Sequence, residues 1–90
     1  MFKNLEELIA IIRKRKQSSN EESYTYKLLN NKKLSIEKVK EEIEELIDAV
    51  EKNTNKVHEA ADVLYHLMVL LEANGIKIED VMDELKKRRK

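Results

Sequence analysis

The segment from about Lys56 to Asn74 constrains the fold more than any other part of the sequence, because at helical spacing it is apolar on two opposite sides. A surface helix normally carries one apolar stripe, whereas a helix that is apolar nearly all round is buried. Gly75 follows at the position where a left-handed residue commonly ends a helix. We therefore expect a buried helix here. One side carries Val57, Ala60, Ala61, Leu64, Leu67, Met68 and Leu71, and the other carries Val63, Val69, Leu70 and Ala73.

Turn-forming residues are scarce elsewhere, since the 90-residue chain has one glycine and no proline. A β-sandwich or barrel needs such residues at its many turns, so an all-β fold is excluded. Apolar residues recur instead at helical spacing, separated by polar breaks. The predicted fold is all-α, an antiparallel helical bundle of about four helices forming a single domain over residues 1–90. The expected helices cover residues 4–16, 35–52, 56–74 and 78–88, and residues 23–29 are compatible with a further short one.

Polar residues at the segment boundaries predict where the helices begin. Asn4 precedes Glu7 by three residues, which is the spacing of a capping box. Ser35 stands before the apolar stripe of the next helix and is the expected N-cap there. The loops are then expected over residues 17–22, 30–34 and 53–55.

Charge is balanced over the whole chain but not along it. Eighteen basic residues cancel 18 acidic ones, which argues against a nucleic-acid partner bound by bulk charge. Residues 41–62 nevertheless hold eight acids against two lysines, and basic clusters lie at 13–16 and 86–90. The longest apolar stretch, residues 63–71, is far too short to span a membrane, and the start of the chain does not resemble a signal peptide. We expect a cytoplasmic protein without a membrane partner.

Two pairs of acids fall on the helices that flank residues 53–55. Glu42 and Glu45 border the apolar stripe of one helix, and Glu59 and Asp62 lie within the second apolar side of the other. Carboxylates are seldom buried without a cation or a metal, because desolvating an unpaired charge costs several kcal/mol. An alternative is that the second apolar side is a dimer contact and the acids pair with Lys or Arg.

Antiparallel packing of these two helices would combine both pairs into one site with four oxygen donors, as in carboxylate metal bundles. The chain has no cysteine, so its metal ligands are limited to oxygen and imidazole. Oxygen ligation favours Mg²⁺, with Mn²⁺ as a possible substitute. Mg²⁺ keeps positions open for water and substrate phosphates, which predicts hydrolysis of a nucleotide polyphosphate.

Histidine and hydroxyl residues give weaker signals. His66 is expected to be a hydrogen-bonded core residue, and His58 is expected on the surface. Ser23 and Tyr24 lie beside the first loop, where their hydroxyls would suit a ribose or a phosphate. Packing with a wet hydroxyl is the alternative role for the tyrosine.

Two strings resemble a known motif. EEIEE (residues 41–45), followed after thirteen residues by EAAD (59–62), resembles the EExxE…ExxD motif of the MazG-like, all-α nucleotide pyrophosphohydrolases. Within that group the chain is most similar to the phosphoribosyl-ATP pyrophosphohydrolase family, which acts at the second step of histidine biosynthesis. The similarity runs almost end to end. It includes RK (15–16), SYT (23–25), EAADVLYHLMVLL (59–71) and GIKIEDVMDELKKR (75–88).

The resemblance implies that Mg²⁺ is coordinated on the substrate's triphosphate. It further implies hydrolysis of phosphoribosyl-ATP to phosphoribosyl-AMP and pyrophosphate, with one glutamate accepting a proton from the attacking water. The implied metal ligands are Glu42, Glu45, Glu59 and Asp62. The implied catalytic residues are Glu41, Glu42 and Glu45, of which Glu41 is either a second-metal ligand or a residue behind the ligands. The candidate phosphate contacts are Arg15, Lys16 and Lys38, with Ser23 and Tyr24.

Two other functions remain open from the sequence. One is a MazG-like house-cleaning pyrophosphatase for nucleoside triphosphates, and the other is a helical dimerisation module whose acids are only surface charge. All three interpretations share one expectation. The second apolar side of residues 56–74 predicts that the bundle is completed by homodimerisation or by a higher homo-oligomer.

Overall fold

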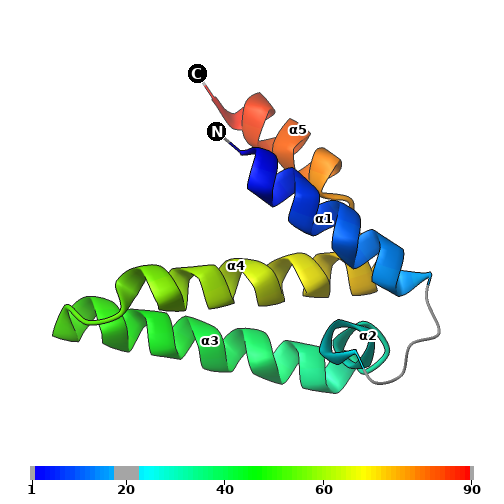
Figure 1. The fold of residues 1–90 in the computed structure, drawn as a ribbon. Helices are drawn as coiled ribbons and strands as arrows, with labels where there is room; N and C mark the ends of the chain where they lie inside the picture. The colour runs from blue at the N-terminus through cyan, green and yellow to red at the C-terminus, as the bar shows by residue number, and fades with distance from the viewer. Residues whose placement is uncertain (1, 18–22, 90) are drawn as a thin grey trace.

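The computed structural model describes residues 2–17 and 23–89, so the predicted loop over 18–22 lies outside the described residues. The described chain is all-α, as predicted, with five helices and no strand. Figure 1 shows α3 and α4 as a long antiparallel pair, with α2 near one end and α1 and α5 extending beyond α4. The helices are α1 (Lys3–Lys16), α2 (Tyr24–Leu29), α3 (Lys32–Lys52), α4 (Lys56–Ala73) and α5 (Ile78–Arg88).

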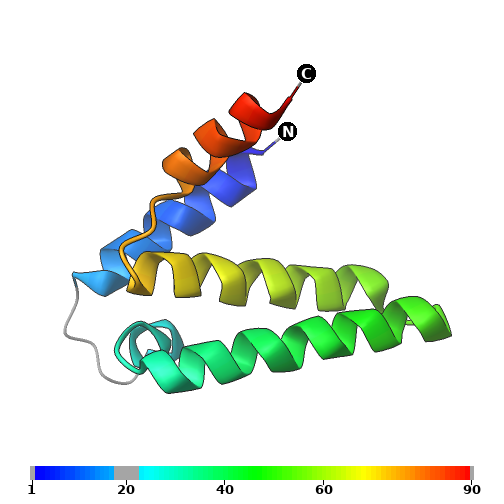
Figure 2. The same ribbon diagram turned by 180° about the vertical axis from the view of Figure 1, so that it is seen from behind.

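A three-residue turn joins α3 to α4. Asn53 and Asn55 both adopt left-handed backbone angles, with φ of 58° and 48°. Asparagine tolerates this conformation because its short polar side chain bonds locally. Between them, the Thr54 amide donates to the Ala49 carbonyl at 3.0 Å, which satisfies one of the last carbonyls of α3. The tight turn sends α4 back along α3, as Figure 2 shows from behind.

The core lies at the C-terminal half of α4. Met68 and Val69 pack there with Ile12 of α1 and Leu28 of α2, and all four side chains are buried. Partly buried apolar residues of α1 and Ile78 at the start of α5 surround this cluster. The predicted burial of α4 is therefore correct at this end of the helix.

The starts of α1 and α3 differ from those predicted, whereas α4 and α5 begin at the predicted residues. Asn4 is not a cap: α1 begins one residue earlier, and the Phe2 carbonyl closes its first turn by accepting from the Glu6 amide. Ser35 is not a cap either, because the Asn31 side chain accepts from the Leu34 amide at 3.1 Å and starts α3 at Lys32. Asparagine caps as well as serine does, and the lysines that follow favour helix. Ser35 consequently lies buried inside α3, and α2 makes a fifth helix beside the four main ones.

Helix ends in the second half of the chain agree closely with the sequence. Helix α4 stops at Ala73, and Gly75 follows with φ of 70°, the left-handed conformation that glycine adopts without strain. Helix α5 has the predicted bounds. None of the described helices combines the length and the apolar character that crossing a bilayer requires.

Five large aliphatic side chains of the α3–α4 hairpin are exposed. Ile43 and Val50 lie on α3, and Val57 and Leu64 lie on α4. With Ile47, these side chains are between 41% and 86% exposed. We call this set the apolar face; it contains Ile43, Ile47, Val50, Val57 and Leu64. The sequence predicted association on the other side of α4, that of Val63, Val69, Leu70 and Ala73, but none of these residues is exposed and Val69 is fully buried within the chain. Val57 and Leu64 were predicted in the core, and their exposure shows that this prediction was wrong for the first half of α4.

Candidate active site

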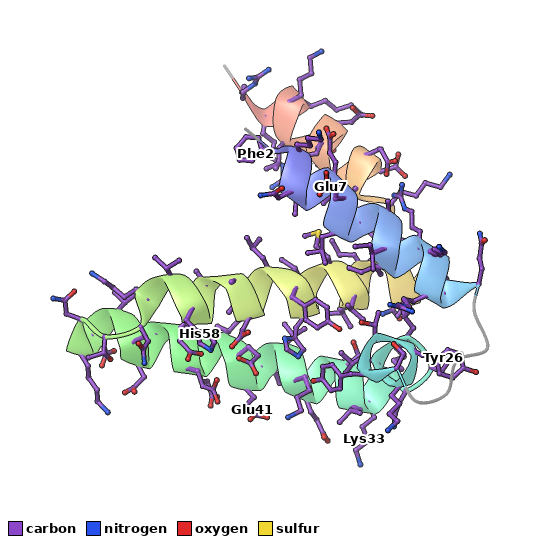
Figure 3. The ribbon with its side chains drawn as sticks, viewed as in Figure 1. Phe2, Glu7, Tyr26, Lys33, Glu41 and His58 are labelled. Carbon is purple, nitrogen blue, oxygen red and sulfur yellow. The ribbon has the colours of Figure 1, made fainter. Side chains whose placement is uncertain are left out.

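Metal-ligating side chains gather in two groups along the α3–α4 hairpin. On α3, Glu41, Glu42 and Glu45 each place an oxygen within 4.8 Å of the other two. On α4, a second group of the same size contains His58, Glu59 and Asp62. Figure 3 labels one residue of each group, Glu41 on α3 and His58 on α4. Because α3 packs along α4, the hairpin brings the two predicted carboxylate pairs into one neighbourhood.

Glu42 is the buried member of the α3 group. Its side chain is 9% exposed, and Oε2 has no hydrogen-bond partner among the residues the structure describes. Burial raises the pKa of Glu42 above its usual value, and the carboxyls of Glu45 and Asp62 raise it further, while His66 acts in the opposite direction. The charged form of this carboxylate is therefore poorly compensated by the chain itself.

Glu59 is its counterpart on α4. Its Oε2 is also buried and, within the described part of the chain, has no partner. Burial raises the pKa of Glu59, and the next cause is the neighbouring carboxyl of Glu45. Glu45 thus interacts with both Glu42 and Glu59, which joins the two groups across the helices.

These side chains fit a divalent cation. A divalent cation would compensate the charge of two buried carboxylate oxygens that have no partner among the described residues, since an uncompensated buried charge costs several kcal/mol. Oxygen ligands suit a hard ion such as Mg²⁺ or Mn²⁺. The four carboxylates that could hold it are Glu42, Glu45, Glu59 and Asp62.

A hydrogen-bonded chain borders the carboxylates. His66 is buried, as predicted, and its Nδ1 donates to the Asp62 carbonyl at 2.8 Å, because a carbonyl only accepts. In the neutral ring Nε2 is then an acceptor, so the Tyr24 hydroxyl donates to it at 2.9 Å. A second hydroxyl pair, Thr25 with Tyr65, also joins α2 to α4. These bonds fix the start of α2 beside the carboxylates.

The predicted phosphate contacts divide into two sets. Lys38 lies beside the site, with Nζ 3.4 Å from Glu41 Oε2, and Tyr24 is close enough for Lys38 to lower its pKa against the dominant effect of burial, which raises it. Ser23 is occupied as the N-cap of α2, where its hydroxyl accepts from the Tyr26 amide.

Arg15 and Lys16 lie elsewhere. Lys16 Nζ donates to the Glu72 carbonyl at 2.6 Å, near the end of α4. That carbonyl is ten residues beyond Asp62, or about 15 Å along the helix axis. Arg15 is exposed at the same end of α1. The structure therefore places both residues away from the carboxylates of their own chain.

Arg13 forms a contact that the sequence did not predict. Its Nε donates to Glu72 at 2.8 Å, and its two terminal nitrogens donate to Glu79 at 2.9 and 2.6 Å. The guanidinium thereby ties α1 to α4 and α5, and it lowers the pKa of Glu79 to about 2. Its partners are 59 and 66 residues away, so no local spacing could indicate them.

His58 was predicted on the surface, and it is 72% exposed. Its position in the α4 group was not predicted, although the i, i+4 spacing to Asp62 is a signal that places two side chains on one helical face.

Comparison with known proteins assigns the family. A family model described as phosphoribosyl-ATP pyrophosphohydrolase matches residues 5–89. The phosphoribosyl-ATP pyrophosphatase of Pyrobaculum arsenaticum is 46% identical, over 98% of this chain and 97% of that protein. The protein of the same name from Clostridium novyi is 43% identical, over 96% of this chain and 81% of the relative.

Some relatives are longer. The histidine biosynthesis bifunctional protein HisIE of Pyrococcus furiosus is 46% identical over 96% of this chain, which spans 41% of that relative's length. No solved structure matches the chain significantly.

Proposed function

This chain belongs to the phosphoribosyl-ATP pyrophosphohydrolase family, and we propose that it hydrolyses phosphoribosyl-ATP to phosphoribosyl-AMP and pyrophosphate. The observation that carries the proposal is the nine-tenths buried Glu42, which keeps an unpartnered oxygen among the clustered carboxylates of α3 and α4. Structural carboxylates are paired within the chain, so this arrangement favours a ligand-binding role.

The proposed cofactor is Mg²⁺, held by Glu42, Glu45, Glu59 and Asp62, with Mn²⁺ as a substitute. When bound, such an ion polarises phosphate oxygens and lowers the pKa of a water molecule. The raised pKa values of Glu42 and Glu59 describe the metal-free chain, in which burial and neighbouring carboxyls oppose their charge.

The chain's own residues position the substrate and accept the proton. Glu41 is exposed at the edge of the α3 group, and it is a candidate base together with Glu42 and Glu45. Lys38 is one helical turn earlier and is free to exchange Glu41 for a substrate phosphate, because their 3.4 Å contact is an exposed ion pair. Tyr24, held by His66, borders the same side.

A pyrophosphate-release assay with Mg²⁺ tests the proposal. We expect turnover of phosphoribosyl-ATP to exceed that of each member of a panel of nucleoside triphosphates. Preference for a noncanonical nucleoside triphosphate would favour the house-cleaning alternative. If no substrate is cleaved, and Glu59→Ala with Asp62→Ala leaves Mn²⁺ binding unchanged, the enzymatic proposal is wrong.

We further propose that the cytoplasmic protein is a homodimer or higher homo-oligomer joined through the apolar face. Five exposed aliphatic side chains on one hairpin support this proposal, since exposed apolar surface of this extent marks association sites. Leu64→Glu would place a charge on this face and is expected to yield monomers in sedimentation. Thr54→Glu, in the exposed turn, is the matched control and should not change the assembly. A wild-type chain that sediments as a stable monomer would overturn the proposal.

A further inference from the structure

His58 is the one nitrogen-bearing member of the α4 group. Its Nε2 lies 3.4 Å from Asp62 Oδ2, and it shares with Glu59 and Asp62 a volume in which all three donor atoms are within 4.8 Å. With an exposed ring, His58 has no packing role in the described chain. An exposed ion pair with Asp62 alone would contribute little to stability.

The spacing of these donors matches a metal site. Ligands bound about 2.1 Å from one ion lie roughly 3.0 Å apart when adjacent and about 4.2 Å apart when opposite. The His58–Asp62 separation falls between these values, and the whole group needs only a small contraction. The i, i+4 spacing holds both side chains on one face of α4, so little backbone movement is needed.

A second observation points to a ligand at this place. Glu59 Oε2 is buried and, among the described residues, accepts no hydrogen bond. Across the hairpin, the nine-tenths buried Glu42 leaves its own Oε2 in the same state. Glu59 Oε2 therefore remains available to an ion bound by His58, and Glu42 Oε2 shows that the neighbouring α3 group also has an oxygen available to a cation.

We propose that His58 is an additional metal ligand, which makes the α4 half of the site prefer a divalent transition ion such as Mn²⁺ over Mg²⁺. The inference rests on the proposed carboxylate metal site and goes beyond it in the donor set. Mg²⁺ binds through oxygen and gains little from imidazole, whereas imidazole is a common ligand of transition ions. Mn²⁺ also accepts carboxylates, so it suits a mixed set of one nitrogen and several oxygens.

The chain offers a clean spectroscopic readout, because it has two histidines. Both ring nitrogens of His66 are already engaged, Nδ1 with the Asp62 carbonyl and Nε2 with the Tyr24 hydroxyl. Imidazole nitrogen coupled to a bound ion would therefore come from His58.

The test uses full-length protein without a histidine tag. Mn²⁺ and Mg²⁺ binding are measured by titration calorimetry for the wild type and for His58→Gln, and bound Mn²⁺ is examined by electron spin echo envelope modulation. We expect nitrogen modulation in the wild type and none in the variant. Mn²⁺ affinity should fall about tenfold in the variant, while Mg²⁺ affinity is unchanged. Lys56→Gln, an exposed residue near the same end of α4, is the control for surface charge.

The other outcomes distinguish a failure of the His58 proposal from a failure of the carboxylate metal site. If Mn²⁺ binds the wild type without nitrogen modulation, or binds His58→Gln equally well, His58 is not a ligand and the carboxylate site stands. If the variant binds both ions more tightly, His58 acts only as a repelling charge, which also overturns the inference. If neither ion binds the wild type, the metal site itself fails.

Discussion

Glutamates in two regions of this molecule have opposite electrostatic surroundings. At the junction of α1, α4 and α5, Glu72 and Glu79 are both bound by Arg13, whose guanidinium lowers the pKa of Glu79 to about 2. In the α3–α4 hairpin, Glu42 and Glu59 each keep a buried oxygen that no described residue binds, and burial raises their pKa. The same side chain is thus stabilised in its charged form in one region and opposed in the other.

This difference separates two uses of a carboxylate. The ion pairs made by Arg13 satisfy their partners within the chain and join α1 to α4 and α5. The hairpin carboxylates reduce the stability of the metal-free fold, because like charges gather where solvent is partly excluded. Groups held in such unfavourable surroundings are typical of binding and catalytic sites.

Removing the α4 carboxylates is expected to have the largest effect. Glu59→Ala with Asp62→Ala should lower turnover by at least about 1,000-fold, since a bound cation contributes several kcal/mol to the transition state. The unfolding temperature in EDTA should stay constant or rise, because repulsion among carboxylates is relieved. Pyrophosphate release and thermal unfolding measure the two effects.

Glu44→Gln is the control for this pair of substitutions, because Glu44 is an exposed acid of α3 outside both metal-ligating groups. Its activity and stability should match the wild type. A marked loss of metal-free stability in the double variant would mean that the α4 carboxylates are structural.

Removing the ion pairs of Arg13 should lower stability without changing metal binding. Arg13→Ala leaves Glu72, whose side chain is 13% exposed, without its guanidinium partner. We expect a loss of about 1–2 kcal/mol in the free energy of unfolding, since the bonds are charged but partly screened by solvent. Urea unfolding measures this loss, and Mn²⁺ affinity should remain at the wild-type value. A variant as stable as the wild type would show that Arg13 does not hold the helices together.

The two regions should respond to pH with opposite sign. Because the folded pKa of Glu79 is lowered, its pair stabilises the fold above about pH 4.5, and that contribution is lost as the pH falls toward about 2. Glu79→Gln should therefore be less stable than the wild type at neutral pH and equal to it in strong acid. Because the folded pKa of Glu42 is raised, its charge destabilises the metal-free fold at high pH, and protonation relieves the cost.

Glu42→Gln in EDTA should accordingly be more stable than the wild type at pH 8, with the difference shrinking as the pH approaches 4.5. Urea unfolding of both variants between pH 3 and pH 8 gives the two curves. Differences that change in the same direction with pH would contradict the contrast between the regions.

A smaller effect on stability is expected from removing the hydrogen bond between Tyr24 of α2 and His66 of α4. Tyr24→Phe removes the hydroxyl that donates to His66 Nε2 and leaves that buried nitrogen unpaired. The expected loss is about 1 kcal/mol of stability, with unchanged Mn²⁺ affinity. Tyr26→Phe is the matched control on the same helix, and an equal loss in both variants would argue against the bond to His66.

Sequence predicted the helices where a strong end signal met a regular apolar pattern. Gly75 and the stripe of α5 placed two boundaries correctly, because each signal acts within a few residues. At the start of α3, Asn31 and Ser35 both had the chemistry of a cap. Choosing between them depends on which residues become buried, and Ser35 is 2% exposed in the folded chain.

The site was predictable to the extent that it follows helical spacing. The i, i+3 pairs and the short turn placed Glu42, Glu45, Glu59 and Asp62 along one hairpin. Spacing cannot tell that Glu42 is the buried carboxylate and Glu45 an exposed one, since that depends on how α3 rotates against α4. Spacing also could not show how far Lys16 lies from the carboxylates. That distance is set by the packing of α1 against the far end of α4.

The turn at Asn53 and Asn55 has a consequence for the order of folding. It joins two helices that are neighbours in the chain, so the carboxylate hairpin can form from contacts of short sequence separation. The bonds of Arg13 close loops of 59 and 66 residues, which form later and at a greater entropic cost. Amide hydrogens of α5 should therefore exchange through partial openings in which α5 detaches while the α3–α4 hairpin stays folded. The carboxylate hairpin would then remain intact in states where the last helix is undocked.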